Sequence, residues 1–388
     1  MDKKSICIVT EEKIPPVYRF SLSFKLAEHL SSNTEVHLVS LTDQGAYSLT
    51  GIEFHPVCVK NWSLFSLKKR FIANVKLLYK VCYVCCKYKI DLLYGWWPVV
   101  FIASFLCRKP FCGDMPEFIE EMYRSFDRPF KKIMGSILKY FQIIAAKKSR
   151  AIIVETEKAK DRWMKRNILE EKIFSFPYGV EVDKFSNPFS DDEKVNLRKE
   201  YNIPEEAFLV MYHGDIGFDD GVDILINTVN ELNETIWLIC IGDGPPEYME
   251  KLKFLASKKI VFTGWKEYKE IPKLFAMSDI YVAPFRSTTY TNTTFPLKQM
   301  EAMAAGKPVI CTKIEAFSKA VNDGEDIILA KPEDKEELKE KILYLLKNRE
   351  KMTFLGNNAK KTAIEKFNWI IRVKKEQELI FKTFTWNF

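Results

Sequence analysis

Short apolar, β-branched runs alternate with longer amphipathic stretches along almost the whole chain. In the first half the runs are SICIVT, VHLVSL, IDLLY and AIIVET; in the second they are LVMYHG, WLICIGDG, IVFTG, IYVAPF, PVICT and DIILA. Near-continuous apolar runs are typical of parallel strands covered on both faces, and strand–helix alternation builds parallel sheets. The pattern therefore predicts an α/β protein with two parallel, Rossmann-like sheets.

A polar stretch divides the two series of runs. It contains Pro188 and SDDEKVNLRKE, and it interrupts the hydrophobic periodicity. We therefore predict a first domain over residues 1–184, a linker over 185–204 and a second domain over 205–365. Ligands of such sheets bind beyond the carboxyl ends of the strands, so we expect the site in a cleft between the domains.

Composition excludes several classes of protein. The chain has 388 residues, of which 47% are hydrophobic and 29% charged, as expected for two ordered domains. Nine cysteines without a zinc-like spacing indicate reduced thiols, no metal site and a cytoplasmic location. The start MDKKSICIVT is typical of a strand rather than a secretory signal. The apolar run from Leu92 to Cys107 contains Gly95 and Pro98 and is shorter than the roughly 18 residues of a membrane span.

Basic residues are concentrated in the first half, and the ranges 60–89 and 128–150 contain no acidic residue. Both ranges show helical periodicity, and in each a predicted apolar stripe lies beside lysines. The stripes are Leu67, Phe71, Val75, Leu78, Cys82 and Cys85, and Phe130, Ile133, Met134, Ile137, Leu138, Phe141 and Ile144. Such a helix either packs on the core with a solvated basic face or contacts an anionic membrane. Two of them in one domain favour peripheral membrane contact on the inner face of the cell membrane, and nucleic acid is disfavoured.

The segment TNTTFPLKQMEAMAAGKPVI predicts a helix whose amino end follows the strand IYVAPF. Thr293 or Thr294 is expected to cap it, and Pro296 suits its first turn. Helix amides, with the charge of Lys298 one turn inside, favour a phosphate. The alternative is an ordinary surface pair between Lys298 and Glu301.

Several of these segments together resemble the donor half of a family-four-type glycosyltransferase of the GT-B fold. They are SFPYGVEVDKF, IGDGPPEY, Gly264 with the helix IPKLFAMSDIYVAPF, the EAMAAGKPVI ending, NDGEDIILAKPED and the terminal FNW. The resemblance covers roughly residues 150–385 and implies two Rossmann-like domains facing a central cleft. It also implies that the last helix, 366–388, packs back on the first domain.

The resemblance implies a nucleotide sugar as donor, bound without a metal ion or cofactor, and transfer with retention to a glycan or lipid-linked acceptor. Glu301 matches the second glutamate of the family's pair, which binds the ribose, whereas Thr293 replaces the first. The donor site implied in this way comprises Gly214, Gly242, Arg286, Thr293, Thr294, Phe295, Pro296, Lys298 and Glu301. Asp215 and Asp220 stand where the family commonly has a basic pair that holds the diphosphate.

Three further residues have two interpretations each. Asp114, after the strand PFCGDM, either orients an acceptor hydroxyl or caps a loop, and we include it with Glu301 as a candidate catalytic residue. His213 faces the expected cleft or is a hydrogen-bonded structural histidine, and His29, His37 and His55 are expected to be structural. Arg19 either replaces a missing glycine-rich turn or lies on the surface.

Three functions are consistent with these motifs. A working glycosyltransferase is favoured by the combined motifs. A catalytically weakened homologue that serves as a partner or regulatory subunit is suggested by the replaced glutamate and the missing basic pair. A sugar-nucleotide epimerase shares the fold.

Overall fold

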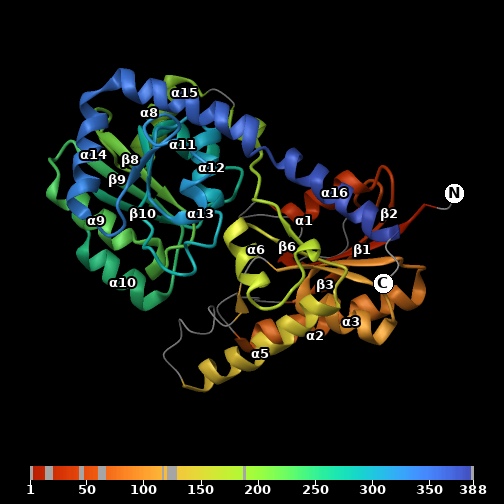
Figure 1. Ribbon diagram of the computed structural model, residues 1–388. Coiled ribbons are helices and arrows are strands. Elements are labelled where there is room, and N and C mark those ends of the chain that lie inside the picture. The colour runs from red at the N-terminus through yellow and green to blue at the C-terminus, as the bar shows by residue number, and fades with distance from the viewer. Residues whose placement is uncertain are drawn as a thin grey trace. The chain divides into compact units, whose positions relative to one another are not determined.

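The computed structural model describes residues 3–13, 21–42, 48–59, 67–115, 118–119, 129–186 and 189–385. The chain divides into two compact units, and each is described by itself (Figure 1). Unit 1 extends to Pro177 and resumes at Arg372, and unit 2 comprises the chain from Tyr178 to Ile371. The stretch 185–204, expected to be a linker, includes helix α8 (Asp191–Glu200) of unit 2.

Unit 1 contains a parallel sheet in the order β3-β2-β1-β4-β5-β6-β7. Its strands are β1 (Ser5–Lys13), β2 (Glu35–Thr42), β3 (Ile52–Cys58), β4 (Leu92–Trp96), β5 (Phe111–Asp114), β6 (Ala151–Val154) and β7 (Ile173–Ser175). Its helices are α1 (Leu22–Leu30), α2 (Leu67–Lys87), α3 (Trp97–Cys107), α5 (Pro129–Lys148), α6 (Glu157–Met164) and η1 (Glu170–Lys172), with most of α16 (Trp369–Thr385). Helices α2, α3 and α5 cover one face of the sheet (Figure 1).

Unit 2 contains a second parallel sheet, in the order β10-β9-β8-β11-β12-β13. Its strands are β8 (Phe208–His213), β9 (Ile236–Ile241), β10 (Ile260–Gly264), β11 (Ile280–Ala283), β12 (Val309–Thr312) and β13 (Ile328–Ala330). Its other elements are α7 (Val182–Phe185), η2 (Phe218–Asp220), α9 (Val222–Glu231), α10 (Pro246–Leu255), α11 (Ile271–Met277), α12 (Leu297–Ala304), α13 (Glu315–Ser318), α14 (Lys335–Lys347) and α15 (Arg349–Lys366). The predicted α/β class with two parallel sheets is confirmed, because helices on both faces bury the apolar strands.

The apolar stripes predicted for α2 and α5 do not all face the core. The residues of α2 buried against the sheet are Ala73, Leu77, Val81 and Val84, whereas Phe71 is 71% exposed. In α5 the buried residues include Gln142, Ala145 and Ala146, whereas four residues of the predicted stripe are exposed: Ile133, Ile137, Phe141 and Ile144. Leu78, Cys82 and Cys85 of the α2 stripe are partly buried against the core. The stripes are thus divided between core and surface, and the contact with a membrane stays a prediction.

Helix α16 contributes a buried ion pair to unit 1. The Arg372 guanidinium donates to the Glu376 carboxylate at 2.7 Å, and both residues are almost fully buried. Arg372 also donates to the carbonyl of Phe176 at 2.6 Å, and Arg150 donates to the carbonyl of Thr383 at 2.5 Å. These bonds tie the residues after Arg372 to the end of β7 and the start of β6.

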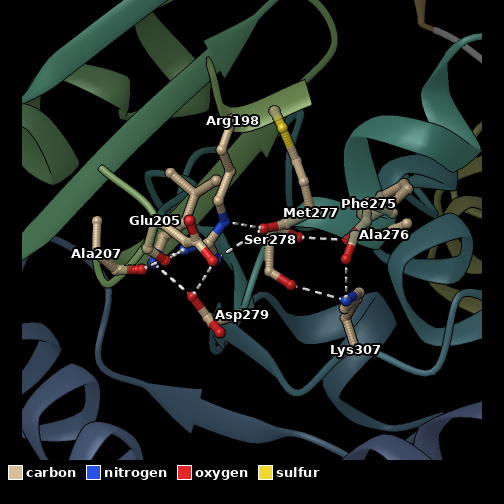
Figure 2. A network of polar contacts seen from close by, with 10 residues as sticks. Arg198, Glu205, Ala207, Phe275, Ala276, Met277, Ser278, Asp279 and Lys307 are labelled. Atoms are coloured by element: carbon tan, nitrogen blue, oxygen red, sulfur yellow. Dashed lines mark hydrogen bonds and ion pairs between the residues drawn. The ribbon is translucent and has the colours of Figure 1, made fainter. Parts of the chain in front are cut away.

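A network of polar contacts joins α8 to the amino ends of β8 and β11 in unit 2 (Figure 2). Arg198 donates to Asp279 at 2.9 Å and to the carbonyls of Met277, Glu205 and Ala207 at 2.7–3.0 Å. Lys307 donates to the carbonyl of Ser278 at 2.7 Å, beside a cavity of about 540 Å³. Carbonyls of the protein thus hold both Arg198 and Lys307 in this cavity wall.

The buried amine of Lys307 predicts a pH-dependent stability. Burial and the nearby charges of Lys194 and Arg198 lower its pKa to about 8, against the opposing effect of Asp279. The unfolded chain then binds more protons between pH 8 and about 10.4, so this group makes stability rise with pH by on the order of 3 kcal/mol across that window. We expect Lys307→Met to lose this rise, as measured by urea unfolding at pH 7.5, 9 and 10. The same pH dependence in both proteins would contradict the prediction.

Candidate functional site

Three loops converge at the carboxyl ends of β8, β9 and β10 in unit 2. Gly214 follows β8 and donates its amide to the carbonyl of Ile241 at 2.8 Å, while Gly242 follows β9 and donates to Gly264 at 2.9 Å. Beyond them, the amide of Ile216 donates to the carbonyl of Asp243 at 3.0 Å. The backbones therefore lie in direct contact at the edge of the sheet where ligands of this fold class bind.

Two glycines allow this close approach. Gly214 and Gly242 have φ values of 117° and 129°, which side chains disfavour. A Cβ at Gly242 would lie 1.9 Å from the carbonyl oxygen of Gly214, and one at Gly214 would lie 2.2 Å from Cε of Lys298. The Lys298 side chain therefore passes directly over the backbone of Gly214.

The Lys298 ammonium is hydrogen-bonded to three groups of the protein at this edge of the sheet. Its Nζ donates to Asp220 at 2.8 Å, to the carbonyl of Asp215 at 2.9 Å and to the hydroxyl of Tyr212 at 3.0 Å. Its side chain is 18% exposed and that of Asp220 16%. Asp220 is thus the counter-ion of Lys298. The alternative given by the sequence, a surface pair of Lys298 with Glu301, is not among the described ion pairs.

Glu301 instead pairs with His213. Nε2 of His213, at the end of β8, lies 2.6 Å from Oε2 of Glu301 on α12, and the two residues are 5% and 4% exposed. Phe275 and Tyr281 pack edge-on against the imidazole. Burial, then the negative charge of Glu301, holds the pKa of Tyr281 well above its usual value, so this phenol stays protonated.

The amino end of α12 differs from the prediction. Its N-cap is Pro296, which offers no side-chain acceptor, so the caps expected from Thr293 and Thr294 are wrong. Both hydroxyls instead donate to the carbonyl of Tyr290, at 3.0 and 2.9 Å. The threonines close a turn of their own before the helix, which leaves the first amides of α12 without a side-chain cap.

Arg286 and Phe295, both predicted to bind the donor, have structural contacts. The Arg286 guanidinium forms two bonds to Asp223, at 3.0 and 2.8 Å, and lies 4.0 Å from the centroid of the Phe218 ring. Phe295 is buried edge-on against Phe317 and Phe367. Their assignment to the donor site stays a prediction.

In unit 1, Asp114 is half-buried at the end of β5, beside Trp96 in the register of β4. Trp96 donates to Asn74 at 2.9 Å, and the Arg70 guanidinium lies 5.1 Å from its ring centroid. Arg70 in turn donates to Glu11 at 3.0 and 2.6 Å. The sequence alone does not indicate this cluster, because Arg70 and Asn74 come from α2; its one signal is that Glu11 and Trp96 follow predicted strands within two residues.

One further residue singled out from the sequence, Arg19, lies outside the described residues.

Residues 193–362 match the family described as "Glycosyl transferases group 1". Unit 2 therefore carries a glycosyl transferases group 1 domain. This confirms the resemblance found in the sequence. The chain is 27% identical over 232 residues to an uncharacterized glycosyltransferase of Methanocaldococcus jannaschii, a match that covers 58% of this chain and 57% of that protein. The chain thus spans about half the length of the curated relatives that it matches.

Solved structures resemble this chain along nearly its whole length. A sucrose-phosphate synthase from Thermosynechococcus elongatus superposes with a TM-score of 0.79 at 16% identity, covering 98% of this chain and 99% of the other. HepE of Anabaena in complex with UDP and glucose gives a TM-score of 0.76 at 17% identity, covering 98% and 100%. These likenesses confirm the GT-B fold.

Proposed function

We propose that this protein is a glycosyltransferase that takes a sugar from a nucleotide-sugar donor bound at the carboxyl edge of the unit 2 sheet. One observation carries the proposal: Gly214, Gly242, Lys298 and Glu301 meet at that edge, within the stretch that matches the group 1 family. HepE of Anabaena, a structural neighbour, was solved with UDP and glucose.

In this proposal the site stabilises the departing diphosphate. The charge of Lys298 and the uncapped amides of α12 favour negative charge as it develops on the leaving group. One oxygen of Glu301 is held by His213, so the imidazole positions the carboxylate that binds the ribose hydroxyls. The proposal includes retention of configuration and no metal ion, as the family resemblance implies.

The contacts of Lys298 and Arg286 favour a second candidate, a weakened homologue that acts as a partner or regulatory subunit. Both cations already have carboxylate partners, Asp220 and Asp223, which oppose the binding of a diphosphate. In a working enzyme the donor therefore competes with Asp220 for Lys298, and helix amides provide the remaining attraction.

A thermal-shift screen against UDP, GDP, ADP and CMP and their sugars tests the proposal. We expect a rise of several degrees with one nucleotide, lost in Glu301→Ala. Transfer or hydrolysis of the matching nucleotide sugar would exclude the non-catalytic candidate. If the protein converts the nucleotide sugar to its epimer when no acceptor is added, the activity is that of an epimerase. No shift with any ligand would overturn the donor site.

We propose that the acceptor is a glycan or lipid-linked glycan that contacts unit 1. Asp114 and Trp96 lie side by side at the ends of β5 and β4, and an aromatic ring with a nearby carboxylate can pack against a sugar and accept from its hydroxyls. Asp114 would then orient the attacking hydroxyl.

The face of unit 1 formed by α2, α3 and α5 supports peripheral contact with an anionic membrane. Helix α3 packs against both α2 and α5, and none of the three helices contains an acidic residue. Their exposed apolar side chains are Phe71, Ile72, Val75, Tyr79, Tyr83, Ile102, Phe105, Leu106, Ile133, Ile137, Tyr140, Phe141 and Ile144. Exposed apolar and basic side chains on one face suit the headgroup region of a bilayer. No described helix is both long and apolar enough to cross a membrane.

We expect Phe71→Glu/Phe105→Glu to weaken flotation with anionic liposomes at least tenfold, because two exposed rings would no longer be buried and two negative charges would be added. The matched control is Phe254→Glu, which changes a 90% exposed phenylalanine of α10 in unit 2 and should bind like the parent. Binding should also weaken with salt. Equal binding to neutral and anionic vesicles would contradict the prediction.

A further inference from the structure

Four ionisable side chains share one face of the unit 1 sheet at its edge. Strand β3 is the edge strand, and it pairs in register with β2 so that Glu53 lies opposite His37 and His55 lies opposite Val39. Alternate residues of a strand point to the same face, which places Glu35 and His37 of β2 beside Glu53 and His55 of β3.

The nitrogen and oxygen atoms of this cluster converge on one point. Nδ1 of His37 lies 3.0 Å from Nε2 of His55 and 3.6 Å from Oε2 of Glu53, and three ligand atoms from the three residues lie within 4.8 Å of one another. Two ligands of a tetrahedral zinc ion are about 3.3 Å apart, given bonds of roughly 2.0–2.1 Å. The separations of the His37 nitrogen from its two partners, 3.0 and 3.6 Å, lie on either side of that value.

Outer contacts fix the orientation of two of these groups. Nε2 of His37 lies 3.3 Å from the Glu35 carboxylate, which can only accept, so with an ion bound Nε2 would carry the proton and Nδ1 would be the ligand atom. The Tyr88 hydroxyl donates to Oε1 of Glu53, while Oε2 is the atom nearest His37. A histidine that binds a metal ion usually donates its other ring N–H to a carboxylate, a carbonyl or a water molecule.

We propose that His37, His55 and Glu53 bind a divalent transition-metal ion, with Zn²⁺ the best match, at the edge of the unit 1 sheet. Two imidazoles and one carboxylate suit zinc, and a water molecule would complete the tetrahedron. The negative charges of Glu35 and Glu53 offset the repulsion from Lys80 and Lys87, which lie near His55. His37 and Glu53 lie near the amino ends of β2 and β3, away from the carboxyl ends where Asp114 and Trp96 lie, so the ion would clamp the edge strand rather than act on the acceptor.

The metal-free alternative is a hydrogen bond in which Nε2 of His55 donates to Nδ1 of His37, and 3.0 Å suits it equally. Equilibrium dialysis of the full-length, reduced and chelator-treated protein against Zn²⁺ distinguishes the two. We expect one ion per chain with a matching rise in Tm, and Co²⁺ should give the intense visible absorption of a tetrahedral site. No stoichiometric binding would leave the hydrogen bond as the explanation and overturn the proposal.

Variants assign the ion to this cluster. Glu53→Gln changes an exposed residue and should weaken Zn²⁺ binding at least tenfold without unfolding the chain, and His55→Gln should abolish it. Glu35→Gln keeps all three ligands and should cost about 10- to 100-fold through the loss of the outer contact. The matched control is His29→Gln, which changes a histidine of unit 1 that contacts Gln377 and should leave affinity unchanged. Binding that persists in His55→Gln, with a cobalt–thiolate absorption band, would assign the ion to cysteines and overturn the proposal.

Discussion

Lys298→Met is expected to weaken the binding of the nucleotide diphosphate selected in the screen about 100-fold. Two effects have the same sign: the variant removes the cation in the first turn of α12, and it leaves the largely buried Asp220 carboxylate without its 2.8 Å partner. Loss of a charged contact to a phosphate in a partly buried site costs roughly 3 kcal/mol, and each 1.4 kcal/mol is a factor of ten. Isothermal titration calorimetry at constant ionic strength measures the change.

The matched control is Lys298→Met/Asp220→Asn, which removes both charges of the pair. If the uncompensated carboxylate contributes to the loss, the double variant binds the nucleotide more tightly than Lys298→Met alone. Asp220→Asn alone should bind at least as tightly as the parent, because it releases Lys298 from its counter-ion. Equal affinity of Lys298→Met and the parent would show that the diphosphate does not lie near this lysine.

The sequence was sufficient to predict the two sheets but not the orientation of every helix. Strands such as β8 and β9 are buried along their length, so continuous apolar runs identified them directly. Helices α2 and α5 have apolar residues on more than one face, and the choice between faces depends on the fit to the sheet, as Ala73 and Ala145 show. Hydrophobic periodicity shows which residues of a helix are apolar, but it does not show which face of the helix the sheet covers.

The candidate site shows a similar limit. The sequence indicated that Lys298 and Glu301 share one face of a helix, and the structure places both on α12. Their partners come from other loops: Asp220 lies far earlier in the chain, and His213 ends β8. Spacing along a helix favours local pairs such as Lys298 with Glu301, so contacts set by tertiary packing could not be predicted from it.

Gly242→Ala is expected to destabilise unit 2 by about 3–5 kcal/mol, which lowers its Tm by roughly 10 °C. The new methyl group would lie 1.9 Å from the carbonyl oxygen of Gly214, a backbone atom that cannot turn aside as a side chain can. The φ of 129° adds strain for any residue with a Cβ, and strain and overpacking each cost about 1–3 kcal/mol. Differential scanning calorimetry of the parent and the variant measures the loss.

Gly264→Ala separates the two contributions, because Gly264 also has a positive φ, 69°, but a Cβ there would meet no atom within 4 Å. This variant should cost only about 1 kcal/mol, the usual penalty of the left-handed region. The contact at Gly242 also positions Gly214, over which the Lys298 side chain passes, so Gly242→Ala should weaken nucleotide binding whereas Gly264→Ala should not. If the two variants lose equal stability, backbone conformation alone sets the requirement for glycine, and close packing of the two loops does not hold the site together.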